Sequence, residues 1–527
     1  MEKKTAFGGL RNSSATRMVS IVTEPLWDVI IVGAGSSGCV LAARLSEQEN
    51  ARVLLIEAGS SPKNSGSYPG EILSASIVAG ARAGLSFNRG VPGNITETRE
   101  FTATRGRILG GSSATNGGYF IRPLPSDFIH WMTSGGSLWG HDTALPLMRA
   151  MENDLDFGAT AIHGDHGPVP VTRTSTASVA THTFFAAAHE LNIPDHLDMN
   201  DGGQEGVGPV PTNTRDGVQY NSAMTYLEPT LARPNLTVWS ETIVERVTFE
   251  GTRATGVRVR RDGVTTDVSA GQVVLSAGAL ATPQLMMLSG IGHRDELARH
   301  GIPLVHHSPG VGKGLSDHPQ LFGQWMPTQT EALEAGSWMG GVLHTTHDDA
   351  AIEIIMSRVS LEELVGAEPT GAHSLMVAPI TPRRTGELTI TSASIDDAPH
   401  VRYNYLNNAD VRADLRASAR LTNALLNTAA IRETAQWSWG PSDEEISNDT
   451  VLDAWIEQIV GTSMHASATA SFAGPEPVVD PEGRVLGVTG LRIADTSILP
   501  ASPRRGPAVA ALLIGELIAE TIKAEGD

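Results

Sequence analysis

Three glycines with a Gly-x-Gly-x-x-Gly spacing could bring a backbone turn against a phosphate group: Gly33, Gly35 and Gly38. The first would allow a tight bend, the second the close approach of a pyrophosphate, and the third the packing of a helix on a strand. Glu57 follows farther along the chain, where a carboxylate can accept hydrogen bonds from ribose hydroxyls. An acid in place of an arginine argues against a 2′-phosphate. The spacing indicates a dinucleotide site, although a glycine turn without a ligand can have the same spacing.

The elements that would position these groups form a strand–helix–strand unit. The apolar, β-branched run Trp27–Val32 leads into the turn, and residues 39–45 have a helix pattern. Residues 52–56 form a second apolar run that ends at Glu57, as expected for buried parallel strands. Because all these parts are in register, nucleotide binding is favoured over a turn without a ligand.

Two more apolar strands are expected, at residues 272–276 and 490–494. The apolar stretch from Ala508 to about Lys523 predicts a buried final helix. In the middle region, residues 320–450, an alternating stretch at 388–391 and a charged helix pattern at 409–427 predict a separate layer of sheet and helix. The fold class is therefore α/β.

The composition limits the possible partners. The chain has 527 residues and a formal net charge of −20, which repels phosphate backbones and argues against a nucleic-acid partner. One cysteine, Cys39, excludes an intramolecular disulfide and a cysteine-based metal site. We expect no metal cofactor. No apolar run reaches the roughly 18 residues of a transmembrane segment.

Three stretches resemble the glucose–methanol–choline (GMC) oxidoreductases. Residues 28–59 look like the family's FAD-binding start, residues 106–117 resemble its first signature, and residues 276–292 resemble its second. The likeness runs from about residue 26 to residue 522. It implies a Rossmann-like FAD-binding domain built from a discontinuous chain, together with a substrate domain of antiparallel sheet and helices.

The resemblance also implies a set of FAD-binding residues, drawn from the first turn, the two signatures and the C-terminal segment. They are Gly33, Gly35, Ser36, Ser37, Gly38, Glu57, Ala58, Arg107, Gly111, Ser112, Asn116, Gly117, Gly118, Val244, Ala277, Gly278, Asp495, Pro507 and Ala508. Val244 falls where the family holds the adenine by backbone contacts. Some relatives attach FAD through a histidine, and Thr115 stands at that position here. We therefore expect non-covalent FAD.

The segment 464–470 resembles the family's His-x-x-Gly-Thr-Cys motif, from which Ala468 and Ala470 depart. By this resemblance His465 is the catalytic base in the oxidation of an alcohol, and flavin N5 takes the hydride. A neutral imidazole suits the proton transfer, because its ordinary pKa lies near neutrality. The chain has 17 histidines, so a surface or packed imidazole is the plainer interpretation of any one of them outside such a motif.

The family usually has a second catalytic His or Asn downstream of the proline that is Pro500 here, and that position is Gly506. The spacing onward to Glu516 matches the family, so a gap does not explain the difference. Either one base suffices, or Arg504 or Arg505 reaches into the site. A guanidinium could stabilise a developing alkoxide but could not act as a base. A contact with the flavin phosphates or the surface is equally compatible with these arginines.

The choice of substrate stays open between two bacterial branches. Residues 153–158 and 163–171 look like aryl-alcohol or hydroxymethylfurfural oxidases, which use O₂. Residues 117–122 and 503–507 look more like the mycofactocin-associated branch. That branch implies a large or cofactor-like alcohol such as mycofactocinol, with electrons passed to a quinone or respiratory carrier. Two alternatives come from other functional classes: a lyase with structural FAD, and a nucleotide-binding protein without turnover.

Five residues of the middle region are candidate pocket walls, although plain core positions are the commoner role for such residues: Trp338, Met339, His344, Met356 and Met376.

The expected division of the chain begins with a flexible extension over residues 1–25, in which Met18 is a candidate natural start. Three segments would form the FAD-binding domain, at residues 26–165, 226–320 and 456–527, the last with the catalytic histidine. Residues 166–225 would form a cap segment and residues 321–455 the substrate domain. We expect a cytoplasmic protein, with peripheral membrane association left open.

Overall fold

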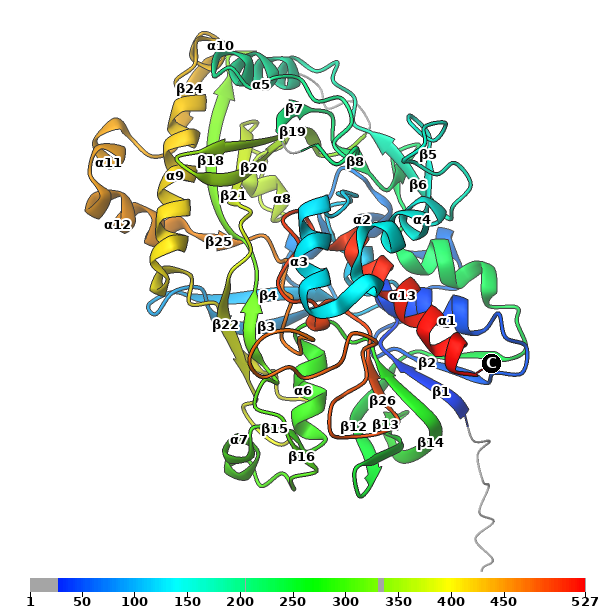
Figure 1. The fold of residues 1–527 in the computed structure, drawn as a ribbon. Coiled ribbons are helices and arrows are strands. Elements are labelled where there is room, and N and C mark those ends of the chain that lie inside the picture. Colours follow the sequence, from blue (N-terminus) through cyan, green and yellow to red (C-terminus); the bar gives the residue numbers. More distant parts are fainter. Residues whose placement is uncertain (1–26, 204, 330–335, 527) are drawn as a thin grey trace, which may run out of the picture.

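The computed structural model describes residues 27–203, 205–329 and 336–526, and Figure 1 shows two large sheets with helices packed around them. The expected extension over residues 1–25, with Met18, lies outside the described residues. Within the described ranges, no helix combines the length and the apolar character needed to cross a lipid bilayer.

The first sheet has seven strands, and five of them pair in parallel. Their order is β11 (Leu236–Trp239), β2 (Val53–Ile56), β1 (Trp27–Val32), β14 (Val264–Leu275) and β26 (Leu491–Ile493). An antiparallel hairpin, β12 (Thr242–Glu250) and β13 (Arg253–Arg261), extends the sheet from β14. The strands expected at both ends of the chain are confirmed, and their carboxyl ends gather at one edge of the sheet.

Two helices from opposite ends of the chain pack together beside this sheet. α1 (Ser36–Leu45) and α13 (Ala508–Gly526) lie side by side, as the blue and red ribbons of Figure 1 show. A Cβ built on Gly515 would lie 2.7 Å from Cβ of Val40, so glycine permits this close approach. Ser37 Oγ donates a hydrogen bond to the Ala511 carbonyl oxygen at 2.6 Å. Both predicted helices are confirmed, and α1 begins earlier than predicted, at Ser36.

The second sheet is antiparallel and forms the separate layer that the middle region predicted. Its strands run in the order β24 (Ala435–Trp439), β18 (Pro319–Pro327), β21 (His373–Pro379), β20 (Ala350–Ser357), β19 (Met339–His347) and β7 (Gly206–Gly208), with β25 (Gly461–Thr462) also paired to β18. The expected helix is α9 (Ala409–Leu426), which packs on β18, β20 and β21. This layer is confirmed.

The alternating stretch at 388–391 is placed differently from our expectation. It falls at the end of β22 (Arg384–Thr389), which belongs to a third sheet and not to the second. That sheet has the order β17 (Lys313–Ser316), β22, β23 (His400–Arg402), β3 (Asn88–Asn94) and β4 (Glu100–Gly106). The alternation was a correct sign of a strand, but a period of two does not identify the partner strand.

The other helices with at least eight residues are α3 (Pro125–Gly135), α4 (His141–Met151), α5 (Val179–Glu190), α6 (Ala281–Leu288) and α12 (Asp449–Ile459). One large hydrophobic core extends through both main sheets. A smaller apolar cluster contains Trp338 and Met339, with the ring of Tyr119 packed against it. This small cluster adjoins the candidate site described below.

Candidate active site

The first glycine turn lies where β1 ends, and its geometry requires glycine. Gly33 has φ of +102°, and a Cβ there would lie 2.6 Å from the Ser276 carbonyl oxygen. A Cβ on Gly38 would lie 1.9 Å from the Gly33 oxygen. At Gly35 the nearest atoms would be 4.0 Å away, and no side chain caps α1, which begins at Ser36. The turn therefore leaves an open helix N-terminus, which suits an anionic ligand such as a pyrophosphate.

Glu57 lies at the end of β2 and is almost fully buried. Its Oε2 accepts the N–H of Ala34 at 3.0 Å, and its Oε1 accepts the N–H of Gly59 at 2.8 Å. Burial raises the pKa of Glu57, and these N–H donors oppose the rise. The Glu57 carbonyl oxygen also accepts the N–H of Thr242, the first residue of β12, which also contains Val244. Glu57 thus holds the turn together, a role that the sequence pattern did not predict.

A second glycine loop meets the first turn. A Cβ on Gly111 would lie only 2.7 Å from Cα of Gly35, so the two backbones are in contact. The side chains of Ser112 and Arg107 are exposed beside this contact, and Arg107 Nε donates to the Ala58 carbonyl oxygen at 3.3 Å. These residues therefore line the same edge of the sheet as the first turn.

The loop continues into Asn116, whose Oδ1 accepts hydrogen bonds from the N–H of Gly118 at 3.0 Å and from Gln219 Nε2 at 2.8 Å. Trp338 Nε1 donates to the Gly117 carbonyl oxygen at 2.9 Å. A Cβ on Gly117 would lie 2.8 Å from the indole ring. Trp338, one of the expected pocket walls, therefore packs directly on this loop.

Asp495 follows β26 and binds the segment that comes after the neighbouring strand β14. Its Oδ2 accepts the N–H of Gly278 at 2.9 Å and the hydroxyl of Thr282 at 2.6 Å, and burial raises its pKa. Gly278, next to Ala277, has φ of +84°, and a Cβ there would meet no atom within 4 Å. This open space lies at the same end of the sheet as the glycine turn. Pro507 and Ala508 stand at the beginning of α13.

His465 follows β25 and is held from two directions. Its Nδ1 lies 3.0 Å from Nδ1 of His318, and its backbone N–H donates to Asp317 Oδ1 at 2.8 Å. A Cβ built on Gly506 would lie 3.6 Å from His465 Nε2. The structure thus places Gly506 beside the imidazole nitrogen that His318 leaves unoccupied. Ser502 Oγ also donates to the His465 carbonyl oxygen, at 2.8 Å.

Both imidazoles of this pair are neutral at physiological pH. Burial, together with the neighbouring His318, lowers the pKa of His465 to about 3. Burial lowers the pKa of His318 to about 4. Burial raises the pKa of Asp317 to about 6, and its Oδ1 accepts the backbone N–H groups of both histidines. His465 Nε2 can therefore accept a proton, provided that Nδ1 carries the ring proton.

A second polar group lies on the other side of Gly506. A Cβ there would be 3.6 Å from Cδ1 of Tyr119, and the Tyr119 hydroxyl donates to Glu353 Oε2 at 2.9 Å. His344 Nε2 lies 2.9 Å from the same oxygen. Burial lowers the pKa of His344 to about 4. Burial would raise the pKa of Glu353, but the hydrogen bond and electrostatic attraction of His344, followed by the attraction of His465 and the hydrogen bond from Tyr119, more than offset it, so the pKa of Glu353 lies below its ordinary value.

Sequence reasoning named His344 as a pocket wall but missed Tyr119, Glu353 and His318. The sequence did contain a signal for the contact between His344 and Glu353. Asp348 and Asp349 both have positive φ and form the two-residue turn between β19 and β20, which sets His344 opposite Glu353. Nothing in the local pattern could place Tyr119 or His318 beside His465.

The two arginines before Gly506 have other partners. Arg505 is buried and donates hydrogen bonds to the carbonyl oxygens of Met199 and Gly203, the latter at 2.7 Å. The backbone N–H of Arg504 donates to Asp127 Oδ1 at 3.0 Å. The hydrogen bonds of Arg505 thus go to the loop around residue 200 and not to His465. Of the remaining expected pocket walls, Met339 and Met376 belong to the small apolar cluster with Tyr119, whereas Met356 belongs to the large core.

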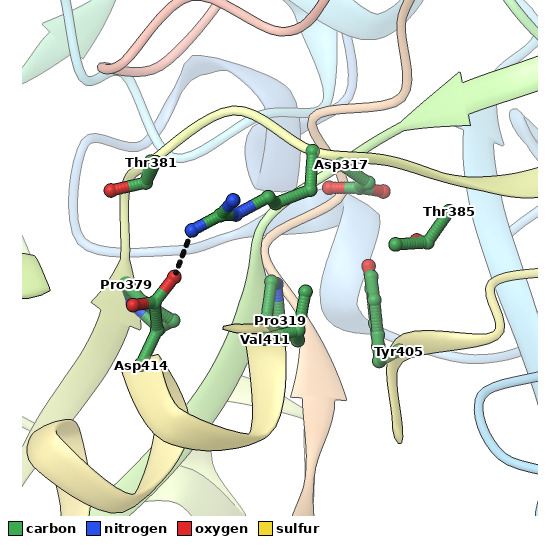
Figure 2. A pocket seen from close by; sticks show the side chains of 9 residues that line it. Asp317, Pro319, Pro379, Thr381, Thr385, Tyr405, Val411 and Asp414 are labelled. Carbon is green, nitrogen blue, oxygen red and sulfur yellow. Dashed lines mark hydrogen bonds and ion pairs between the residues drawn. The ribbon is translucent and has the colours of Figure 1, made fainter. Parts of the chain in front are cut away.

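Asp317 also lines a small cavity, with Tyr405, Thr385 and Asp414 among the other lining residues. Figure 2 shows this cavity, in which Arg383 forms an ion pair with Asp414 at 3.3 Å. Apart from Asp317, it shares no residue with the candidate site, so we do not assign it to the substrate or the cofactor.

One group of described residues has metal-ligating types within reach of one another: Glu152, Asp154 and His163. Two guanidiniums already contact it. Arg122 is ion-paired with Glu152, and Arg173 Nη2 lies 2.9 Å from Asp154 Oδ2. The cluster is therefore a buried network of ion pairs in which arginines occupy the place of a cation.

Comparisons with known proteins agree with this geometry. Family models described as GMC oxidoreductase match residues 27–320 and 382–515. An uncharacterised GMC-type oxidoreductase in the thcA 5′ region of Rhodococcus erythropolis is 36% identical, over 93% of this chain and 97% of its own. Human mitochondrial choline dehydrogenase is 32% identical, over 99% of this chain and 94% of its own. The crystal structure of pyridoxine 4-oxidase from Mesorbium loti has a TM-score of 0.87 at 28% identity, covering 94% of this chain and 99% of its own. The chain belongs to the GMC oxidoreductase family, as an enzyme that acts on CH–OH donors.

Proposed function

We propose that this protein oxidises an alcohol with non-covalently bound FAD and with His465 as the general base. The observation that carries the proposal is the neutral His465, whose Nε2 faces the space at Gly506. The Thr469 hydroxyl donates to the Ala279 carbonyl oxygen at 2.7 Å, which ties the segment of His465 to the loop after β14. The candidate base is thus fixed to the same sheet edge as the glycine turns.

FAD is the cofactor typical of GMC oxidoreductases, and the residues present fit it. The open space at Gly35 and Gly278 and the uncapped N-terminus of α1 suit a bound dinucleotide. Glu57, Arg107 and the other residues named from the resemblance would hold it. Thr115 has no side-chain nitrogen for a histidyl bond to the flavin, which supports non-covalent binding.

In the proposed reaction, the substrate hydroxyl lies beside His465 Nε2, which takes the hydroxyl proton as the O–H bond breaks. Bound FAD supplies the acceptor for the hydride that leaves the carbinol carbon, so the product is a carbonyl compound. His318 holds His465 Nδ1 and fixes the orientation of the ring. The Asp317 carboxylate holds the backbone of both histidines and keeps the pair in place.

The proposal also covers the class of alcohol substrate and the electron acceptor. The missing side chain at Gly506 supports a large or cofactor-like alcohol such as mycofactocinol, with electrons passed to a quinone or respiratory carrier. An ordinary aryl-alcohol or hydroxymethylfurfural oxidase that uses O₂ is the alternative. The names of two relatives, choline dehydrogenase and pyridoxine 4-oxidase, support an alcohol that carries a nitrogen group. We propose a cytoplasmic location for the protein.

To test this, a panel of alcohols is added anaerobically to the purified flavoprotein, and the flavin absorbance at about 450 nm is recorded. Bleaching by an alcohol is expected. An oxidised spectrum that persists with every alcohol, while carbon–carbon cleavage products form, would show a lyase with structural FAD and would overturn the proposal. Reoxidation of the bleached enzyme by O₂ or by a quinone then distinguishes oxidase from dehydrogenase.

A further inference from the structure

Glu353 is a buried carboxylate that the proposed reaction does not use. It lies on β20, and its side chain is 5% exposed. Both hydrogen bonds that it receives, from Tyr119 and His344, go to Oε2. Among the described residues, none donates a hydrogen bond to Oε1. Half of the carboxylate is therefore available to a ligand.

The charge of Glu353 also lacks a cationic partner at contact distance. Within the described ranges its one ion-pair contact is with His344, which is neutral because its pKa lies at about 4. The positive charge of Arg505 interacts with Glu353, but the hydrogen bonds of Arg505 go to carbonyl oxygens of the loop around residue 200. A buried carboxylate without a paired cation is costly to keep, so its retention points to a function.

The position of Glu353 connects it to the candidate base. The ring of Tyr119 contacts the space at Gly506, which borders His465 Nε2, and the hydroxyl of Tyr119 holds Glu353. The carboxylate is thus one tyrosine side chain away from the expected place of the reacting hydroxyl. Its negative charge is near enough to act on the protonation of His465 and His318. Aromatic side chains suit a neighbouring cation, and Tyr119 and Trp338 pack in one cluster here.

We infer that Glu353 is the anionic subsite for a cationic nitrogen group of the alcohol substrate, held some carbons away from the carbinol carbon. The inference rests on the proposed alcohol oxidation and specifies its substrate class. A quaternary ammonium, a protonated amine or a pyridinium would each place positive charge beside Oε1. Tyr119 and His344 are positioning residues, because they fix the orientation of the carboxylate and leave that oxygen free.

The test uses two alcohols of equal shape, 4-(trimethylammonio)benzyl alcohol and 4-tert-butylbenzyl alcohol, which differ in one charge. The wild-type enzyme should oxidise the cationic alcohol with a kcat/KM at least about tenfold higher. In Glu353→Gln the preference should disappear, so that the ratio of kcat/KM for the cationic alcohol to that for the neutral alcohol falls to about one. Glu433→Gln, at an exposed acid, removes the same charge from the surface and should keep the preference. A wild-type enzyme without charge preference, or a Glu353→Gln enzyme that keeps it, would overturn the inference.

Binding of phenyltrimethylammonium, measured by calorimetry on the holoenzyme, separates this inference from the proposed function. Binding that Glu353→Gln weakens at least about tenfold supports the subsite, even if no alcohol bleaches the flavin and the oxidation proposal fails. Oxidation of the neutral alcohol with no binding that depends on Glu353 overturns the subsite alone. Flavin content and thermal midpoint report whether the variant is folded. Should Glu353→Gln not retain flavin, Glu353→Asp keeps the charge but withdraws it by one methylene, and a smaller preference for the cation is then expected.

Discussion

Glu57→Gln tests the glycine turn, because the glutamine has the shape of the glutamate but cannot accept both of its hydrogen bonds. The two carboxylate oxygens accept the N–H groups of Ala34 and Gly59 at 3.0 and 2.8 Å. The amide oxygen of glutamine can accept one N–H, and its NH₂ group then faces the other donor. A hydrogen bond to a charged acceptor contributes about 1.5–3 kcal/mol, so the loss of one should weaken the turn by about that amount.

Because the same turn is expected to bind the pyrophosphate and ribose, FAD affinity should fall about ten- to a hundredfold. The assay titrates apoprotein with FAD and follows flavin fluorescence, and the thermal midpoint of the apoprotein is measured alongside. The exposed-acid variant Glu433→Gln is the matched control for the change in charge. An unchanged dissociation constant together with an unchanged midpoint would refute the role of Glu57 in the turn. A lower midpoint with an unchanged dissociation constant would show that Glu57 supports the fold but not the cofactor.

Three further predictions concern the catalytic pair, the gap beside it and the buried ion-pair network. His465→Ala should retain FAD and lower the rate of flavin reduction by about 10²–10⁴, since a general base is removed; stopped-flow reduction at the parent rate would show that His465 is not the base. Gly506→Ala should fold normally, because its Cβ meets Tyr119 and His465 at an ordinary 3.6 Å, whereas Gly506→Asn should lower kcat/KM more for a bulky alcohol than for a small one; equal gains on both alcohols would contradict the need for space. Burial alone would lower the pKa of His163, but the surrounding carboxylates raise it to about 10. The stability from this charge is therefore fully present below the ordinary pKa of 6.5 and is lost as the pH rises through about 10. His163→Gln should destabilise the protein more at pH 6 than at pH 10 in urea unfolding, and an equal loss at both pH values would contradict the charged histidine.

The parts of the molecule that could be predicted are those in which the cause is local. The strand, turn and helix around Gly33 are fixed by neighbouring residues, so their spacing indicated the fold and the nucleotide site together. Gly506 could be placed only by resemblance, and the structure sets it beside His465, where a second catalytic side chain would stand. The contact between His465 and His318 joins distant segments, and no period in the sequence specifies such a pairing. For the same reason, the alternation at 388–391 did not show that its strand, β22, pairs in a third sheet.

The gap at Gly506 and the charge of Glu353 pose one electrostatic problem. In the proposed reaction negative charge develops on the substrate oxygen as His465 takes the hydroxyl proton, and glycine at position 506 offers no side-chain hydrogen bond to this oxygen. Glu353 lies behind Tyr119 and adds an unfavourable negative charge to the same region. A neutral alcohol would meet both disadvantages, whereas a positive nitrogen bound at Glu353 would neutralise the carboxylate and attract the developing alkoxide through space. A cation on the substrate can therefore stabilise the charge to which Gly506 offers no side-chain hydrogen bond, and this argues that Gly506 and Glu353 belong to one site.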